Sequence, residues 1–193
     1  MSRKFDPRQK DRLLAEERHA LLHPADLLRE LGLARGDTIA DIGCGPGFFT
    51  IPAAEIVGIE GRVLAADIQG DMLSAVKARV LEHGLTNVRI VKTSDTEIPM
   101  PPNCADLVLL AFTLNEVDQR ARFLHRVGRL LKADGKVAVI EWEKLSEQIG
   151  PPVEARISTD ELLKDAEAAG LGPGEQRSLN EHHYLCTLLP ARR

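Results

Sequence analysis

The sequence predicts an α/β fold in which helices cover both faces of a seven-stranded, mostly parallel sheet. The period of the apolar residues switches repeatedly between about 2 and 3.6 along the chain. The strand segments are almost wholly apolar, which is typical of parallel strands buried on both faces. Two closely spaced strand segments near the C-terminus predict a hairpin, and hence an antiparallel strand in the sheet.

The expected elements follow in chain order. Strands are expected at 38–42, 62–67, 88–93, 105–111, 136–143, 175–179 and 183–188. Helices are expected within 7–32 and at 48–57, 71–82, 118–131 and 158–169. Pro24 suits the first turn of a second helix within the N-terminal segment. Ser158 or Thr159 suits a helix N-cap, with Glu161 in the first turn.

The composition is that of an ordinary globular protein, with 44% hydrophobic and 28% charged residues. The formal net charge of −4 argues against nucleic acid as the main partner, and the 4% aromatic content argues against a platform for single strands. The N-terminal residues lack the apolar core of a signal peptide, and no stretch is long enough to span a membrane. Three scattered cysteines fit a reducing compartment, so we expect a cytoplasmic protein.

The segment 41–48, Asp-Ile-Gly-Cys-Gly-Pro-Gly-Phe, is the most informative part of the chain. It follows the first expected strand, at the edge where open α/β sheets bind ligands. Gly43, Gly45 and Gly47 allow a tight turn and a close approach of the backbone to a ligand. With the neighbouring Asp41, they exceed what a simple strand–helix turn requires.

A dinucleotide site is the main alternative for this glycine loop, and it requires the spacing G-x-G-x-x-G. Counted from Gly43 the sixth position is Phe48, and counted from Gly45 it is Thr50, so the spacing fails in both registers. Pro46 also lacks the N–H group that a pyrophosphate would use. A Walker-type loop fails as well, because no Lys followed by Ser or Thr closes it.

The segment 41–47 resembles motif I of the class I S-adenosylmethionine (SAM)-dependent methyltransferases, which have a Rossmann-like fold. The resemblance implies that Asp41 binds the ammonium group of the methionine part of SAM. Asp67, at the end of the second expected strand, stands about 20 residues past the loop, where an acid can bind both ribose hydroxyls. The alternative for Asp41 is an acid that only caps backbone groups of the turn. The alternative for Asp67 is the N-cap of the helix that follows, although Asp71 could also serve as that cap.

The segment 93–99 resembles the D-A-x-x-L-P loop that follows the third strand in this family. The resemblance implies that Asp95 receives the adenine amino group, with Ser94 or Thr96 beside it; an ordinary polar loop is the alternative. The full set of expected cofactor-binding residues is Asp41, Gly43, Cys44, Gly45, Gly47, Asp67, Ile68, Met72, Ser94, Asp95, Thr96 and Phe112.

No catalytic residue is certain from the sequence, and two residues are candidates. Relatives often have His where this chain has Asn115, so a His-assisted deprotonation is not carried over, and Asn115 is expected to orient an acceptor. Glu141 and Glu143 share a strand face opposite Trp142, and Glu141 is a candidate general base. The alternative for these glutamates is a solvated strand end.

The histidines predict no metal site. His19 and His23 share one helix face, but no third ligand is identifiable, so a surface or lid role is favoured. His182 and His183 are adjacent on a strand and point to opposite faces, which argues against joint chelation.

The resemblance covers roughly residues 30–145. Within it, 131–135 resembles the L-L-K-P-G-G turn before the fifth strand and is expected to cap a helix. We expect one domain, with residues 1–34 as an N-terminal helical lid over the cofactor and 35–193 as the core.

The resemblance implies a methyltransferase that moves a methyl group from SAM to a small-molecule acceptor by in-line displacement. The chain is similar to the branch with the ubiquinone/menaquinone C-methyltransferases, whereas arsenite methylation would need clustered cysteines. A SAM-binding module without catalysis and, less favoured, an NAD(P)-dependent oxidoreductase are the alternatives. As partners we expect the acceptor alone or also a second copy in a homodimer, with no nucleic acid and no membrane span.

Overall fold

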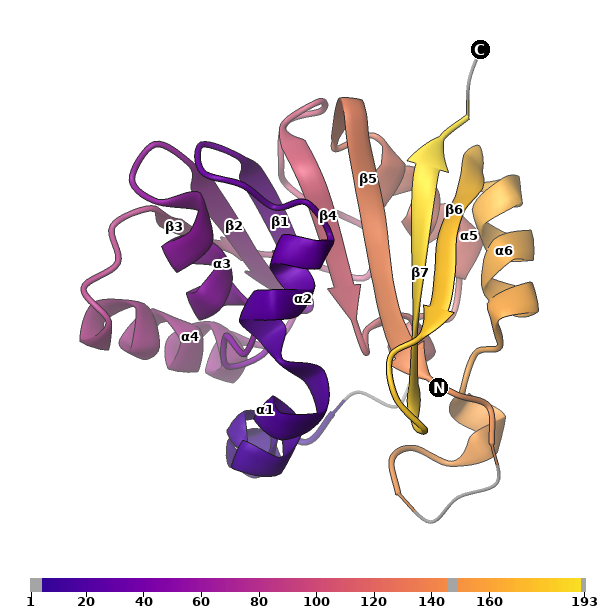
Figure 1. The fold of residues 1–193 in the computed structure, drawn as a ribbon, viewed down its shortest axis with the longest axis horizontal. Coiled ribbons are helices and arrows are strands. Elements are labelled where there is room, and N and C mark those ends of the chain that lie inside the picture. Colours follow the sequence, from indigo (N-terminus) through magenta and orange to yellow (C-terminus); the bar gives the residue numbers. More distant parts are fainter. Residues whose placement is uncertain (1–4, 146–148, 192–193) are drawn as a thin grey trace.

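The computed structural model describes residues 5–145 and 149–191, which form a seven-stranded sheet (Figure 1). The strands are β1 Thr38–Ile42, β2 Arg62–Asp67, β3 Val88–Lys92, β4 Ala105–Ala111, β5 Leu131–Trp142, β6 Leu171–Ser178 and β7 His183–Pro190. Their order is β3-β2-β1-β4-β5-β7-β6. The first five pair in parallel, and β7 pairs antiparallel with β5 and β6. The expected fold class is confirmed, including the C-terminal hairpin.

Helices cover both faces of this sheet. The α-helices are α1 Glu16–Leu22, α2 Pro24–Glu30, α3 Thr50–Val57, α4 Gly70–Glu82, α5 Arg120–Gly128 and α6 Thr159–Ala168. Short 3-10 helices are η1 Pro7–Leu14, η2 Leu114–Glu116 and η3 Val153–Ala155. In β4, Leu107 and Leu109 pack with α2 and α3, while Val108 and Leu110 pack with α5 and α6. Because alternate residues are buried on opposite faces, the strand reads as a continuous apolar run.

The parallel pairing brings the carboxyl ends of β1 to β5 to one edge of the sheet. Figure 1 shows α1 and the segment after β5 at this same end of the molecule, the lower edge in that view. Side chains that follow different strands in the sequence therefore become neighbours at this edge.

The expectation that 131–135 caps a helix is wrong. Helix α5 ends at Gly128, and Leu131 already pairs with Ala105 as the start of β5. The next paired residue of β5 is Lys136, so the intervening residues bulge out of the ladder. Gly135 packs against β4 so closely that a Cβ there would lie 2.8 Å from the carbonyl oxygen of Ala105. The expectation rested on the resemblance to a turn, and such a local resemblance does not specify the pairing of Leu131 with Ala105 on another strand.

The N-terminal segment divides into two parts. Leu27 and Leu28 of α2 are buried in the core cluster on the face of the sheet that α2 and α3 cover. Helix α2 is therefore part of the core. By contrast, Leu13 of η1 and Arg18 of α1 line the cavity described below. Across residues 5–145 and 149–191, no helix is long and apolar enough to cross a membrane.

A capping box begins α6, as expected. The Ser158 hydroxyl accepts the N–H of Glu161 at 3.2 Å, and the Glu161 carboxylate accepts the N–H of Ser158 at 2.8 Å. Both N–H groups thereby gain a hydrogen-bond partner. The N–H of Glu161 lies in the first turn of α6, where no backbone carbonyl of the helix can accept it.

The capping box yields a stability prediction. Ser158→Ala removes one of its two hydrogen bonds and should lower the free energy of unfolding by about 1 kcal/mol, measured by urea denaturation. Thr159→Ala, one residue inside the helix, is the control and should change it by less than about 0.5 kcal/mol. Equal effects of the two substitutions would show that the box does not stabilise α6.

Candidate functional site

A cavity of about 1660 Å³ lies at the carboxyl edge of the sheet. Its walls come from η1, α1 and the segments that follow β1 to β5, together with the turn before β7. A typical pocket for one small molecule measures roughly 300–1,000 Å³, so this cavity has room for two bound molecules.

The N–H groups of the glycine loop, residues 43–47, are used within the protein. Gly43 and Cys44 donate to the carbonyl of Ala66 at 2.8 and 2.9 Å. Gly45 donates to Oδ2 of Asp67 at 2.9 Å. These bonds tie the loop after β1 to the end of β2.

The rest of the loop offers no donor either. Gly47 donates to the carbonyl of Cys44 at 3.0 Å, and Pro46 has no N–H group. Dinucleotide and Walker loops bind phosphate through free backbone N–H groups, and none remains here. The structure thus disfavours a phosphate-bearing ligand on this loop, in agreement with the failed spacing.

Two of the expected glycines are required by packing. A Cβ on Gly43 would lie 2.3 Å from Oγ1 of Thr113, and one on Gly47 would lie 2.7 Å from Cγ2 of Val76. Both glycines also have positive φ. Gly43 lines the cavity, whereas Gly47 does not and instead lets α4 approach the loop.

Asp41 is a buried carboxylate at the cavity wall. It is 2% exposed, and its Oδ2 accepts the hydroxyl of Thr50 at 2.6 Å. Burial raises its pKa to about 6, and the nearby charge of Asp67 acts in the same direction. A cation bound in the cavity would therefore be strongly favoured beside it.

Asp67 joins the glycine loop to the start of α4. Its Oδ2 accepts the N–H of Gly45, and its Oδ1 accepts the N–H of Gln69 at 2.8 Å. The N-cap position of α4 is occupied by Gln69, so Asp67 is not that cap. Burial raises the pKa of Asp67, and its carboxylate lines the cavity with acceptor capacity left for a ligand hydroxyl.

The loop after β3 brings Ser94, Asp95 and Thr96 to the same cavity. The Ser94 hydroxyl accepts the N–H of Glu97 at 3.1 Å, so it shapes the loop itself. The carbonyl of Asp95 accepts Nη2 of Arg126 at 2.9 Å, which ties the loop to α5. The three acids at the ends of β1, β2 and β3 thus converge on one cavity.

The remaining expected residues, Cys44, Ile68, Met72 and Phe112, also line the cavity. Phe112 has a φ of 58°, a left-handed conformation that is rare for a bulky side chain. Such strain persists only where the surrounding structure enforces it, and it occurs often at ligand sites. Here the strained residue lies in the cavity wall, directly after β4.

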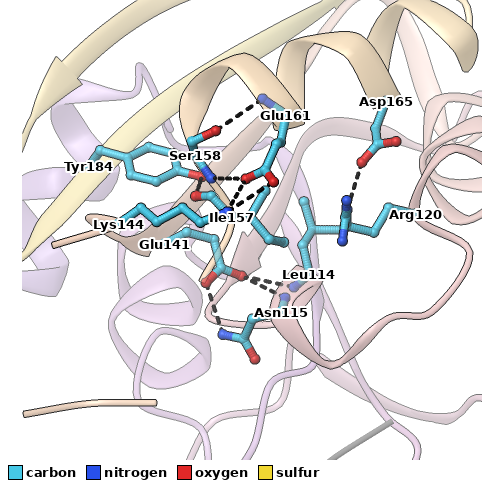
Figure 2. A network of polar contacts seen from close by, with 10 residues as sticks. All are labelled: Leu114, Asn115, Arg120, Glu141, Lys144, Ile157, Ser158, Glu161, Asp165 and Tyr184. Atoms are coloured by element: carbon cyan, nitrogen blue, oxygen red, sulfur yellow. Dashed lines mark hydrogen bonds and ion pairs between the residues drawn. The ribbon is translucent and has the colours of Figure 1, made fainter. Parts of the chain in front are cut away.

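Glu141 is buried beneath the cavity wall. Its Oε1 accepts the N–H of Leu114 at 2.9 Å, and its Oε2 accepts Nδ2 of Asn115 at 2.9 Å (Figure 2). It is 1% exposed, so the solvated strand end considered above is wrong for this residue. Burial raises its pKa to about 7.

Asn115 lines the cavity, whereas Glu141 does not. Because its amide nitrogen donates to Glu141, Asn115 keeps its amide oxygen as an acceptor, and Figure 2 shows that oxygen turned away from Glu141. Glu141 is therefore linked to the cavity by its hydrogen bonds with Asn115 and does not line the cavity itself.

The sequence reasoning missed Arg18. Its guanidinium lies 4.6 Å from the ring centroid of Phe48 and 4.9 Å from that of Phe112, and it donates to the carbonyl of Leu13 at 3.0 Å. Burial lowers its pKa to about 10, so it remains a cation at neutral pH, close to Asp41. A single arginine in an amphipathic helix gives no sequence signal for such a position.

The histidines form no metal centre among the described residues. His19 packs on Phe48 with ring centroids 4.4 Å apart, which closes α1 onto the glycine loop. His23 links α1 to α2 in a left-handed conformation. His183, by contrast, is buried in the cavity wall.

Three aromatic rings, those of Phe112, Trp142 and His183, form a group called here the aromatic wall. The ring centroid of His183 lies 4.3 Å from that of Trp142 and 5.0 Å from that of Phe112. All three residues line the cavity. Phe112 directly follows β4, Trp142 ends β5 and His183 begins β7, so the wall lies on the other side of β1 from the loop after β3.

The raised pKa of Glu141 predicts a pH-dependent stability. Its pKa is about 7 in the folded chain against an ordinary value of 4.5, so the folded state binds more protons between these pH values. The free energy of unfolding therefore falls as the pH rises from about 4.5 to 7. Glu141→Gln should flatten this fall, measured by urea denaturation from pH 4.5 to pH 8, while Glu143→Gln should keep the wild-type slope. An unchanged slope in Glu141→Gln would contradict the assignment.

The model of the ubiE/COQ5 methyltransferase family matches residues 5–151. The ubiquinone/menaquinone biosynthesis C-methyltransferase UbiE of Azotobacter vinelandii is 32% identical over 156 residues, which are 72% of this chain and 62% of that protein. The chain therefore spans less than two thirds of the length of this relative.

Solved structures agree with the family match. A SAM-dependent methyltransferase from Aquifex aeolicus has a TM-score of 0.91 at 32% identity, covering 96% of this chain and 98% of that chain. The cyclase SpnF has a TM-score of 0.74 at 17% identity, covering 87% and 81%, and shows the fold alone. On the match over residues 5–151, this chain belongs to the ubiE/COQ5 methyltransferase family.

Proposed function

We propose that this chain is a SAM-dependent methyltransferase that transfers a methyl group to a small-molecule acceptor by in-line displacement. One observation carries the proposal: Asp41, Asp67 and Asp95, from three neighbouring strand ends, line one cavity with the glycine loop. The loop has no free N–H group for a phosphate, which favours a nucleoside cofactor without one.

The donor is proposed to lie along β1, β2 and β3. Asp41 would bind the ammonium group of the methionine part, and Asp67 the ribose hydroxyls. Asp95 would receive the adenine amino group, with Ser94 and Thr96 beside it. Backbone and side chains that line the same stretch would complete the contact; they are Gly43, Cys44, Gly45, Ile68, Met72 and Phe112.

The acceptor is proposed to lie toward β4 and β5. The cavity exceeds the size of a single-ligand pocket and continues to Asn115 and Trp142, which leaves space for a second small molecule. The name of the UbiE relative assigns it C-methylation in ubiquinone/menaquinone biosynthesis. A carbon acceptor on an organic molecule is therefore consistent with this family.

The chain's residues would act by alignment and desolvation. Bound SAM supplies a methyl group on a sulfonium, whose sulfur leaves as a neutral thioether. Arg18 and His19 of α1 pack on Phe48, next to the glycine loop, and would exclude water from the bound cofactor as a lid does. Asn115, held by Glu141, would orient the acceptor through its amide oxygen, so Glu141 is a positioning residue.

We also place the protein in the cytoplasm. Cys44, Cys104 and Cys186 are free thiols, and two of them are buried, which fits a reducing compartment.

A SAM-binding module without catalysis is the second candidate. It is favoured by Asn115, because a neutral amide cannot take up a proton as an imidazole can. Both candidates predict cofactor binding, and only the first predicts methyl transfer.

Cofactor binding can be tested by calorimetry with S-adenosylhomocysteine. Asp67→Ala removes two hydrogen bonds to the ribose and should weaken binding by about a hundredfold or more. Asp71→Ala, an exposed acid in the first turn of α4, should leave the affinity unchanged. Thermal unfolding of each variant separates lost binding from lost folding, because Asp67 also holds Gly45. No heat from the wild type at millimolar ligand, or heat with NADH instead, would overturn the donor assignment.

Turnover can be tested with SAM labelled in its methyl group and a panel of quinol, thiol, amine and carboxylate acceptors. We expect label to appear in one class. Asn115→Ala should reduce that rate by about tenfold or more while changing S-adenosylhomocysteine affinity by less than about threefold. Cofactor binding without any labelled acceptor would favour the non-catalytic module.

A further inference from the structure

The imidazole of His183 is the least explained group in the cavity wall. His183 begins β7 and pairs with Trp142 of β5 in the antiparallel register. It is 3% exposed, and it lines the cavity. It also lies beyond residues 5–151, the part of the chain that the family model matches.

Neither ring nitrogen of His183 has a hydrogen-bond partner among the described residues. Its backbone is fully used, since its N–H donates to Oδ1 of Asn180 at 3.0 Å and its carbonyl accepts the N–H of Leu179 at 2.8 Å. Buried polar atoms without partners are rare in folded proteins because each costs free energy. The side chain is thus held in place with two unpaired polar atoms at a ligand cavity.

The charge state of this ring follows from its surroundings. Burial lowers the pKa of His183 to about 4, and the charges of His182, Arg18 and Arg156 act in the same direction. The ring is therefore neutral at neutral pH, with one nitrogen as a donor and the other as an acceptor. A hydroxyl group matches it, because a hydroxyl also donates and accepts.

The other two rings of the aromatic wall carry cations beside them. The guanidinium of Arg18 lies 4.9 Å from the ring centroid of Phe112, and that of Arg156 lies 5.4 Å from the ring centroid of Trp142. Phe112 and Trp142 line the cavity beside His183, whose two ring nitrogens are the unpaired polar atoms of this wall. The wall lies at β4, β5 and β7, whereas the donor is proposed to lie at β1 to β3.

We propose that His183 binds the methyl acceptor, through a hydrogen bond between its imidazole and a hydroxyl group of the acceptor. This inference rests on the proposed function and deepens it, because it assigns the acceptor's polar group to a residue. His183 is a binding residue here, and no proton transfer is assigned to it.

The probes for this inference are phenol and toluene, which have similar shapes and differ in the hydroxyl group. Each is titrated into the full chain in the presence of S-adenosylhomocysteine, and NMR records the dissociation constants and the ¹⁵N shifts of the His183 ring. We expect phenol, and not toluene, to shift those ring nitrogens. The ratio of the toluene to the phenol dissociation constant should fall by about two- to tenfold in His183→Phe, the value of one neutral hydrogen bond.

A control variant and a measurement on the wild type distinguish a specific role of His183 from a general effect of the substitution. His125→Phe removes an exposed histidine on α5 outside the cavity and should leave the ratio unchanged. The wild-type ring shifts need no variant, so they decide the matter even if His183→Phe fails to fold.

The inference is overturned if phenol leaves the ring nitrogens unshifted, if the ratio is unchanged in His183→Phe, or if neither probe binds. Calorimetry with S-adenosylhomocysteine on the same samples separates the two proposals. Cofactor binding with no phenol effect defeats the role of His183 alone, whereas absent cofactor binding defeats the proposed function and this inference with it.

Discussion

The parallel pairing of β1 with β2 and β4 is the constraint on which the site depends. It fixes the direction of neighbouring strands, so Asp41, Asp67 and Phe112 all emerge at one edge of the sheet. The hydrogen bond from Gly45 to Asp67 then joins the glycine loop to the end of β2. A shift in either pairing would separate groups that the cavity needs side by side.

The site concentrates charge where water is excluded. Asp41 and Glu141 are both almost fully buried, and burial raises the pKa of Asp41 to about 6 and that of Glu141 to about 7. Arg18 lies near Asp41 between two aromatic rings. Charges held in such a setting interact strongly with a bound ligand, because the local dielectric is low.

The fold alone does not decide the chemistry. The cyclase SpnF shares the architecture at 17% identity, which illustrates that one scaffold supports different reactions. What distinguishes this chain is the set of residues that line its cavity. The glycine loop, residues 43–47, leaves no N–H group for a phosphate, and we propose that a second molecule binds near the aromatic wall and Asn115.

Much of the fold and part of the cavity lining follow from the sequence alone. The bounds of β1, β2 and β4 match the predicted ones, because a strand buried on both faces is a continuous apolar run with polar ends. The glycine loop and the acids that end successive strands were also predictable, because sheet polarity places them together.

Only the tertiary structure decided the rest. The start of β5 at Leu131 depends on its pairing with Ala105, a contact that local periodicity does not encode. The burial of Glu141, the packing of Arg18 on Phe112 and the unpaired ring of His183 each arise between elements far apart in the chain. The solvation, pKa and hydrogen bonds of a residue are determined by its neighbours in space. Local sequence patterns do not specify those neighbours when they come from distant parts of the chain.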